Sequence, residues 1–222
     1  MSDHNSKPSK PENNVELELL LVYAVLGNPE AQFEVAGRYF TGNGVKKDDA
    51  KAFKWWNRSA EQGHLDAQFN VGVSYEYGIG ISKNITEANR WYLQAAEKGH
   101  ASAQNEMGLH CNEGRGIKKD RKAAVEWWRR AADHGHPEAQ YNLGVCFAEG
   151  KVVKKDMEEA VMLWGKSAEQ GYAKSQYNLG VCHENGWGVK KNRKIALDLF
   201  HKAAEQKYAS AVRALKTLGE KD

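Results

Sequence analysis

The chain has 222 residues, of which 41% are hydrophobic and 27% charged, an ordinary composition for a folded protein with a sizeable core. A net charge of +3 does not by itself indicate a nucleic-acid-binding protein. No apolar segment is long enough to span a bilayer, and the polar first residues do not predict a secretory signal peptide.

The N-terminal part of the chain predicts a tail followed by one helix. Residues 1–14 combine Pro8 and Pro11 with serine, lysine and asparagine, and predict a disordered segment. The leucine-rich segment 15–27 predicts a helix. Its Gly27 lies one repeat period before Gly63, so this helix takes the place of the second helix of a missing unit. We therefore expect it to cap the N-terminal end of a stack without exposing its core.

A sequence repeat of 36 residues occupies the rest of the chain. A constant period of this length indicates stacked helix pairs, and the sequence predicts a single solenoid domain over 15–222. The predicted repeats are 31–66, 67–102, 103–138, 139–174 and 175–210, followed by a partial repeat at 211–222.

Each repeat predicts two helices, with positions counted from 1 to 36. Helix A covers positions 1–11, with positions 1, 5 and 9 facing the core, and a Gly-x-Gly turn follows in most repeats. Helix B begins after an Asp or Asn cap at position 18, carries large side chains at positions 25 and 26, and ends before position 33, which is glycine in four repeats and Lys207 in the fifth. Position 6 of helix A is glycine in four repeats, which costs about 1 kcal/mol relative to alanine. We therefore expect a neighbouring helix to approach closely there.

The pattern A-Q-x-N-L-G-V-x-x-x-x-G-x-G-V-x-x-D, followed by W-W and A-A-E-Q-G, resembles the Sel-one-like repeat family, relatives of the tetratricopeptide repeats. The resemblance covers about residues 15–218. It implies an all-α fold, a right-handed solenoid whose helices A line the concave side, and a role as an adaptor or scaffold. One secreted branch of the family has two bridged cysteines per repeat and is linked to penicillin binding; this chain lacks that pairing.

The three cysteines are Cys111, Cys146 and Cys182. Cys146 and Cys182 are one period apart, and helices stacked roughly 8–10 Å apart place equivalent residues too far from each other for a disulfide. An odd number of cysteines predicts reduced thiols and a cytoplasmic protein.

No pattern of catalytic, cofactor-binding or metal-binding residues is present, and we expect no enzyme activity, no cofactor and no metal. His64, His100 and His136 share position 34, one per repeat, which favours packing in the loops over a metal site. Two further histidines are each adjacent to a cysteine, in the pairs His110-Cys111 and Cys182-His183. Adjacent side chains point apart on a helix, so these pairs do not predict a nucleophile with its base.

The candidate binding residues lie on the side of helix A opposite positions 1, 5 and 9. Aromatic rings at position 3 and polar groups at position 4 predict a track for an extended peptide, although the same residues could serve only to stack helices A. Trp187, in the fifth A–B loop, is either a binding hot spot or a ring that packs within the loop. The predicted binding residues are Phe69, Asn70, Tyr77, Glu106, Glu113, Tyr141, Asn142, Tyr177, Asn178 and Trp187.

The charge pattern predicts the kind of partner. Acidic residues outnumber basic ones on helices A, whereas lysine and arginine outnumber acids in the loops and helices B. We expect a monomeric scaffold that binds a protein or peptide partner, with a neutral or basic segment on the helix A face. Two alternatives stay open: a hydrolase-like or small-molecule-binding activity, as in the cysteine-rich branch, and an anionic or nucleic-acid partner on the lysine-rich loops. Acids interleaved with those lysines argue against nucleic acid.

Overall fold

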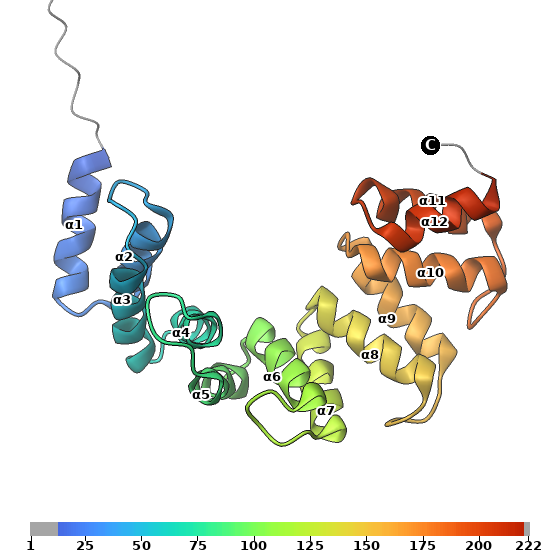
Figure 1. The fold of residues 1–222 in the computed structure, drawn as a ribbon, viewed down its shortest axis with the longest axis horizontal. Coiled ribbons are helices and arrows are strands. Elements are labelled where there is room, and N and C mark those ends of the chain that lie inside the picture. The colour runs from blue at the N-terminus through green and yellow to red at the C-terminus, as the bar shows by residue number, and fades with distance from the viewer. Residues whose placement is uncertain (1–12, 220–222) are drawn as a thin grey trace, which may run out of the picture. The chain divides into compact units, whose positions relative to one another are not determined.

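The computed structural model describes residues 13–219, which form twelve helices and no strand (Figure 1). Eleven of these helices have 13 residues each, and the last has 10. The helices are α1 (Asn13–Val25), α2 (Pro29–Thr41), α3 (Asp49–Glu61), α4 (Leu65–Tyr77), α5 (Ile85–Glu97), α6 (Ala101–Glu113), α7 (Arg121–Asp133), α8 (Pro137–Glu149), α9 (Met157–Glu169), α10 (Ala173–Asn185), α11 (Arg193–Glu205) and α12 (Ala209–Leu218).

These helices alternate as predicted. Helices A are α2, α4, α6, α8 and α10, and helices B are α3, α5, α7, α9 and α11. The chain divides into two compact units, one ending at Ala95 and the other beginning at Ala96. Within the first unit α1, α2, α3 and α4 pack in succession, and within the second each helix from α6 to α12 packs on the next. The all-α solenoid architecture of 36-residue helix pairs is confirmed.

The start of each helix A differs from the prediction, whereas the start of each helix B agrees with it. Helices B begin after the predicted caps, for example Asp156 before α9. Helices A begin two residues earlier than predicted, and Pro29 and Pro137 are the first residues of α2 and α8, where proline has no helical N–H to lose. α1 begins at Asn13, inside the predicted tail, and the rest of that tail lies outside the described residues. The single domain over 15–222 stays a prediction.

The position 34 histidines have a definite structural role. Each is the N-cap of a helix A, and its Nδ1 accepts a hydrogen bond from the backbone N–H three residues later. His64 caps α4 at 3.2 Å and His136 caps α8 at 3.3 Å. Burial lowers the pKa of His136, which favours the neutral ring that can accept this bond.

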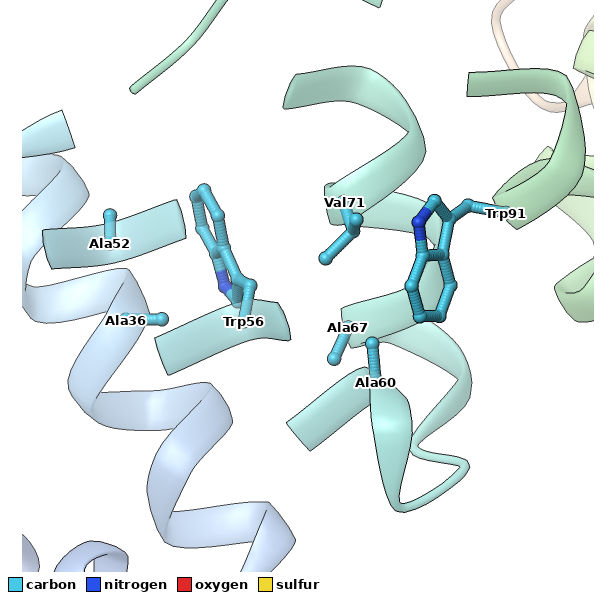
Figure 2. Close-up of a cluster of buried hydrophobic side chains, with 7 residues drawn as sticks. All are labelled: Ala36, Ala52, Trp56, Ala60, Ala67, Val71 and Trp91. Atoms are coloured by element: carbon cyan, nitrogen blue, oxygen red, sulfur yellow. The ribbon is translucent and has the colours of Figure 1, made fainter. Parts of the chain in front are cut away.

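The glycines at position 6 make room for aromatic rings. A Cβ at Gly144 would lie 2.6 Å from Nε1 of Trp164, and one at Gly180 would lie 2.7 Å from Cε1 of Phe200. The close neighbour is thus a position 26 side chain from helix B of the same repeat, rather than the backbone of a neighbouring helix. In the first repeat the residue is Ala36, and Figure 2 shows it beside the Trp56 ring.

A regularly spaced set of glutamines, which the sequence prediction did not use, ties consecutive repeats together. The position 2 glutamines are almost fully buried. Gln140 Nε2 donates to the carbonyl of Ala132 at 3.4 Å, and Gln170 Nε2 donates to Gln140 Oε1 at 3.0 Å. Because a buried amide is stable only when it is bonded, these glutamines favour one register between neighbouring helices.

The two ends of the repeat series differ. The outer side of α1 is apolar: Val22 is 53% exposed, Val25 73% and Leu26 77%. The corresponding positions of every helix B are polar. The role of α1 as an N-terminal cap stays a prediction. α12 has Lys216 at position 6, where the other helices A have glycine or alanine. It therefore lacks the small residue against which an aromatic ring of helix B packs in the other repeats.

Candidate functional site

The ten predicted binding residues are divided between the two compact units. Phe69, Asn70 and Tyr77 belong to the first unit, where Phe69 and Asn70 are half-buried and Tyr77 is exposed at the end of α4. The other seven belong to the second unit. Five of those seven line two clefts there; Glu106 and Glu113 on α6 line neither.

The larger cleft, which we name the Trp187 cleft, has a volume of about 620 Å³. It lies between α8, α9 and α10 and brings together Tyr177, Asn178 and Trp187. Its walls are mostly apolar. The lining residues are Ala148, Lys155, Met157, Trp164, Tyr177, Asn178, Val181, Cys182, Gly186, Trp187 and Gly188.

The smaller cleft, which we name the Arg121 cleft, has a volume of about 420 Å³. It brings together Tyr141 and Asn142 of the predicted set. The lining residues are Asn112, Arg121, Trp128, Tyr141, Asn142, Val145, Cys146, Glu149, Lys151 and Val152.

The two clefts are the same site in consecutive repeats. Subtracting one 36-residue period from Tyr177, Asn178 and Trp187 gives Tyr141, Asn142 and Lys151, which line the Arg121 cleft. Trp164, Val181 and Cys182 also have their repeat equivalents there. Each cleft is therefore formed by helix A of one repeat, helix B of the preceding repeat and an A–B loop.

The position 3 rings are held by other rings. Tyr177 lies with its ring centroid 5.7 Å from that of Phe200 and 5.5 Å from that of Tyr208. Tyr141 packs in the same way on Tyr172 at 5.5 Å. Burial raises the pKa of both Tyr141 and Tyr172, so both phenols keep their protons at neutral pH. The position 3 rings therefore support helix stacking, and Tyr141 and Tyr177 also line the clefts.

The position 4 asparagines contact the preceding repeat. Asn178 lies close to the Tyr141 side chain, and Asn142 Nδ2 donates to Asn105 Oδ1 at 3.5 Å. Asn105 Nδ2 in turn donates to Glu138 Oε2 at 3.3 Å. Both position 4 side chains are half-buried. These contacts use only part of the hydrogen-bonding capacity of each amide, so each can also bond a ligand.

Most acids of the helix A face in the second unit are paired with cations of the A–B loops or of the first turn of a helix B. Glu149 forms an ion pair with Lys151 at 3.2 Å, and Glu184 forms one with Arg193 at 3.5 Å. Glu113 pairs with Arg115 at 3.7 Å. These pairs reduce the net negative charge that this face presents to a partner.

Trp187 is 54% exposed, although its backbone is well held. Its N–H donates to the carbonyl of Cys182 at 3.1 Å, and Gly186 N–H donates to the same carbonyl at 2.8 Å. The same backbone bonds form around Asn43 and Arg115 in other loops, so the turn does not need a tryptophan. The large side chain is therefore available for contact with a partner.

Several lining residues were missed by the sequence prediction. Arg121 and Met157 are the first residues of α7 and α9, and Lys155 comes from the A–B loop. The periodicity assigned helix B to the core, so its first turn did not stand out. The variation at position 19, arginine in one repeat and methionine in the next, is the signal that could have found this wall.

The three cysteines are free, and their surroundings suppress their reactivity. Burial raises the pKa of both Cys146 and Cys182 to about 11. Since the thiolate is the nucleophile, neither cysteine is suited to covalent catalysis at neutral pH.

We expect native protein at pH 7.5 to react slowly with iodoacetamide, because the thiols stay protonated, and faster as the pH rises toward 11. After denaturation without reductant, thiol titration should find three free groups. A count of one would show a disulfide and contradict both this prediction and the cytoplasmic assignment that rests on reduced thiols.

Comparison with known proteins identifies the family. The Sel1 repeat matches at residues 29–64, 65–100, 101–136, 137–172 and 173–208. The chain therefore belongs to the Sel1 repeat family, as its sequence pattern predicted. Proteins of this family are generally protein–protein interaction scaffolds. No curated protein matches the chain.

Among solved structures, a Sel1 repeat protein from Oxalobacter formigenes is 37% identical, with a TM-score of 0.80 over 90% of this chain and 84% of that one. The protein c5321, a protective antigen of uropathogenic Escherichia coli strains with an SLR fold, is 37% identical with a TM-score of 0.81. The match covers 87% of this chain but only 41% of c5321. The immunity protein Pa5087 from Pseudomonas aeruginosa shares the fold at 20% identity, with a TM-score of 0.51 over 92% of this chain and 70% of that one.

Within residues 13–219, none of the helices combines the length and apolar character that crossing a membrane requires.

Proposed function

We propose that this chain is a non-catalytic scaffold that holds an extended peptide segment of a protein partner along helices A of its second unit. The observation that carries the proposal is the occurrence of one cleft in two consecutive repeats. An extended peptide repeats its backbone groups at regular intervals, so it suits a surface that repeats its pockets. Asn142 and Asn178 offer amides for the peptide backbone, and the rings beside them offer apolar contact area.

The partner's charge, the monomeric state and the cytoplasmic location stay predictions. The preference for a basic segment rested on acids of helix A, and Glu149 and Glu184 are already paired with cations of this chain. The proposal therefore rests on the clefts and the amides rather than on net charge.

The position 17 lysines of the A–B loops have a structural explanation. At position 17 the lysine Cβ lies against the glycine that ends helix A, for example Lys191 at 3.5 Å and Lys119 at 3.2 Å from a Cβ placed on that glycine. Their stems cover the turn while their charged ends stay in water. The small-molecule alternative has less support, because this chain lacks the paired cysteines of that branch.

The test needs a defined probe, for which we choose peptides selected from a phage library of random dodecapeptides on the wild-type protein. Asn142→Ala combined with Asn178→Ala is expected to weaken the selected peptides at least about tenfold, because unpaired backbone groups cost about 1–3 kcal/mol each. Fluorescence anisotropy would measure the affinity.

Two controls separate binding from stability. Asn105→Ala removes the acceptor that Asn142 contacts, lies outside both clefts and leaves both position 4 asparagines in place, so it should lower stability without the loss of binding. Lys118→Glu with Lys190→Glu changes the exposed outer loops and should leave affinity nearly unchanged at physiological salt. If the loop variant loses the peptides and the asparagine variant keeps them, the binding surface is on the lysine-rich loops and not in the clefts.

A further inference from the structure

The two clefts have the same architecture and different chemistry. Where the Trp187 cleft has Met157 and Trp187, the Arg121 cleft has Arg121 and Lys151. The change at these two equivalent positions converts an apolar pocket into a cationic one. Tyrosine, asparagine, valine, cysteine and tryptophan occupy equivalent positions in both clefts. Two smaller differences are Ala148 and Gly188 in the Trp187 cleft, where the Arg121 cleft has Asn112 and Val152.

The lining of the Trp187 cleft is mostly apolar. Trp164 is 5% exposed and forms its floor, Met157 and Val181 are half-buried at its sides, and Trp187 is 54% exposed at its edge. Tryptophan and methionine are side chains that binding surfaces use as anchors and adaptable contacts. At about 620 Å³ the cleft has room for an aromatic side chain of a partner.

The Arg121 cleft has an uncompensated cation. Lys151 is paired with Glu149 at 3.2 Å, so these two charges offset each other. Arg121 is exposed at the first turn of α7 and forms no ion pair with any of the described residues. The first turn of α7 contains no acidic residue, whereas that of α9 contains Glu158 and Glu159. A free guanidinium beside this cleft favours a carboxylate, which it can bind through two hydrogen bonds.

We infer that the two clefts are consecutive subsites for one partner segment, in which an aromatic side chain enters the Trp187 cleft and an Asp or Glu side chain binds Arg121. This inference rests on the proposed function and adds the side chains that are recognised. It predicts an acidic segment at this position, in contrast to the basic or neutral segment predicted from the sequence.

The spacing of the two side chains follows from the helix packing. Asn178 contacts Tyr141 across the gap between α10 and α8, so consecutive helices A are neighbours here. Neighbouring helices lie roughly 8–10 Å apart. An extended chain advances about 3.3 Å per residue, so the acid and the aromatic residue should be about three positions apart.

The experiment is a selection of phage-displayed random dodecapeptides on the wild-type protein, followed by selection on Arg121→Glu and Trp187→Ala. The wild type should enrich peptides with an aromatic residue and an Asp or Glu about three positions apart. Arg121→Glu should replace the acid with Lys or Arg and keep the aromatic residue. Trp187→Ala should weaken the wild-type peptides about tenfold or more, as loss of a tryptophan anchor does.

Arg129→Glu is the matched charge control, because Arg129 is an exposed arginine on the same helix that does not line the Arg121 cleft. It should leave the selected pattern unchanged. Peptides that depend on Asn142 and Asn178 but show no paired aromatic and acid, or whose acid survives Arg121→Glu, would overturn the inference and leave the proposed function standing. Selected peptides that bind the Asn142→Ala, Asn178→Ala variant as well as the wild type would overturn the proposed function itself.

Discussion

Replacing Trp164 with alanine is expected to lower the free energy of unfolding by about 3–5 kcal/mol, the range for a buried tryptophan. The ring is 5% exposed, lies in a core cluster with Ala160 and Cys182, and rests on Gly144. Its Nε1 also donates to the carbonyl of Tyr141 at 3.2 Å. The substitution removes these contacts and leaves a cavity between α8, α9 and α10. Chemical denaturation monitored by circular dichroism would measure the change.

Trp127→Ala is the matched comparison, because position 25 looks equivalent to position 26 in the sequence. The Trp127 ring is only half-buried, and Arg130 covers it with its guanidinium carbon 4.8 Å from the ring centroid. We expect a loss of about 1–2 kcal/mol, since less apolar surface is exposed to water on unfolding. Equal losses for Trp127→Ala and Trp164→Ala would contradict this distinction between the two side chains.

The second large effect concerns two glycines that helix propensity treats alike. Gly144 in α8 and Gly165 in α9 both lie inside helices, where replacement by alanine normally stabilises by about 0.5–1 kcal/mol. A Cβ at Gly144 would lie 2.6 Å from Trp164 Nε1, whereas one at Gly165 would meet no atom within 4 Å. We expect Gly144→Ala to destabilise by about 1–3 kcal/mol through overpacking and Gly165→Ala to stabilise.

Thermal and urea unfolding of the two alanine variants would check these opposite signs. A further variant, Gly144→Ala with Trp164→Leu, replaces the ring that the new methyl group meets. If overpacking is the cause, the loss caused by Gly144→Ala should be smaller in the Trp164→Leu background. Stabilisation by Gly144→Ala in the wild-type background would show that the ring can move aside and that the glycine is not required.

The candidate site was predicted in part. Tyr141, Asn142, Tyr177, Asn178 and Trp187 line the two clefts, since a residue one period further along occupies the equivalent place on the next repeat. Glu106 and Glu113 do not line them, although both lie on the predicted side of helix A. A helix face predicts a direction for a side chain, but a cleft also requires walls from other elements.

The amino-acid sequence by itself determined the repeat length, the two helices of each repeat, their caps and their core positions. These features depend on local geometry: 3.6 residues per helical turn, the capping bonds of Asp and Asn, and the left-handed backbone of glycine. Only the tertiary structure decided that Trp164 rests on Gly144, that Gln140 bonds the carbonyl of Ala132, and that Arg121 and Trp187 face consecutive clefts. Such contacts join residues of different helices, and their distances follow from how side chains of particular volume pack together, which periodicity alone does not specify.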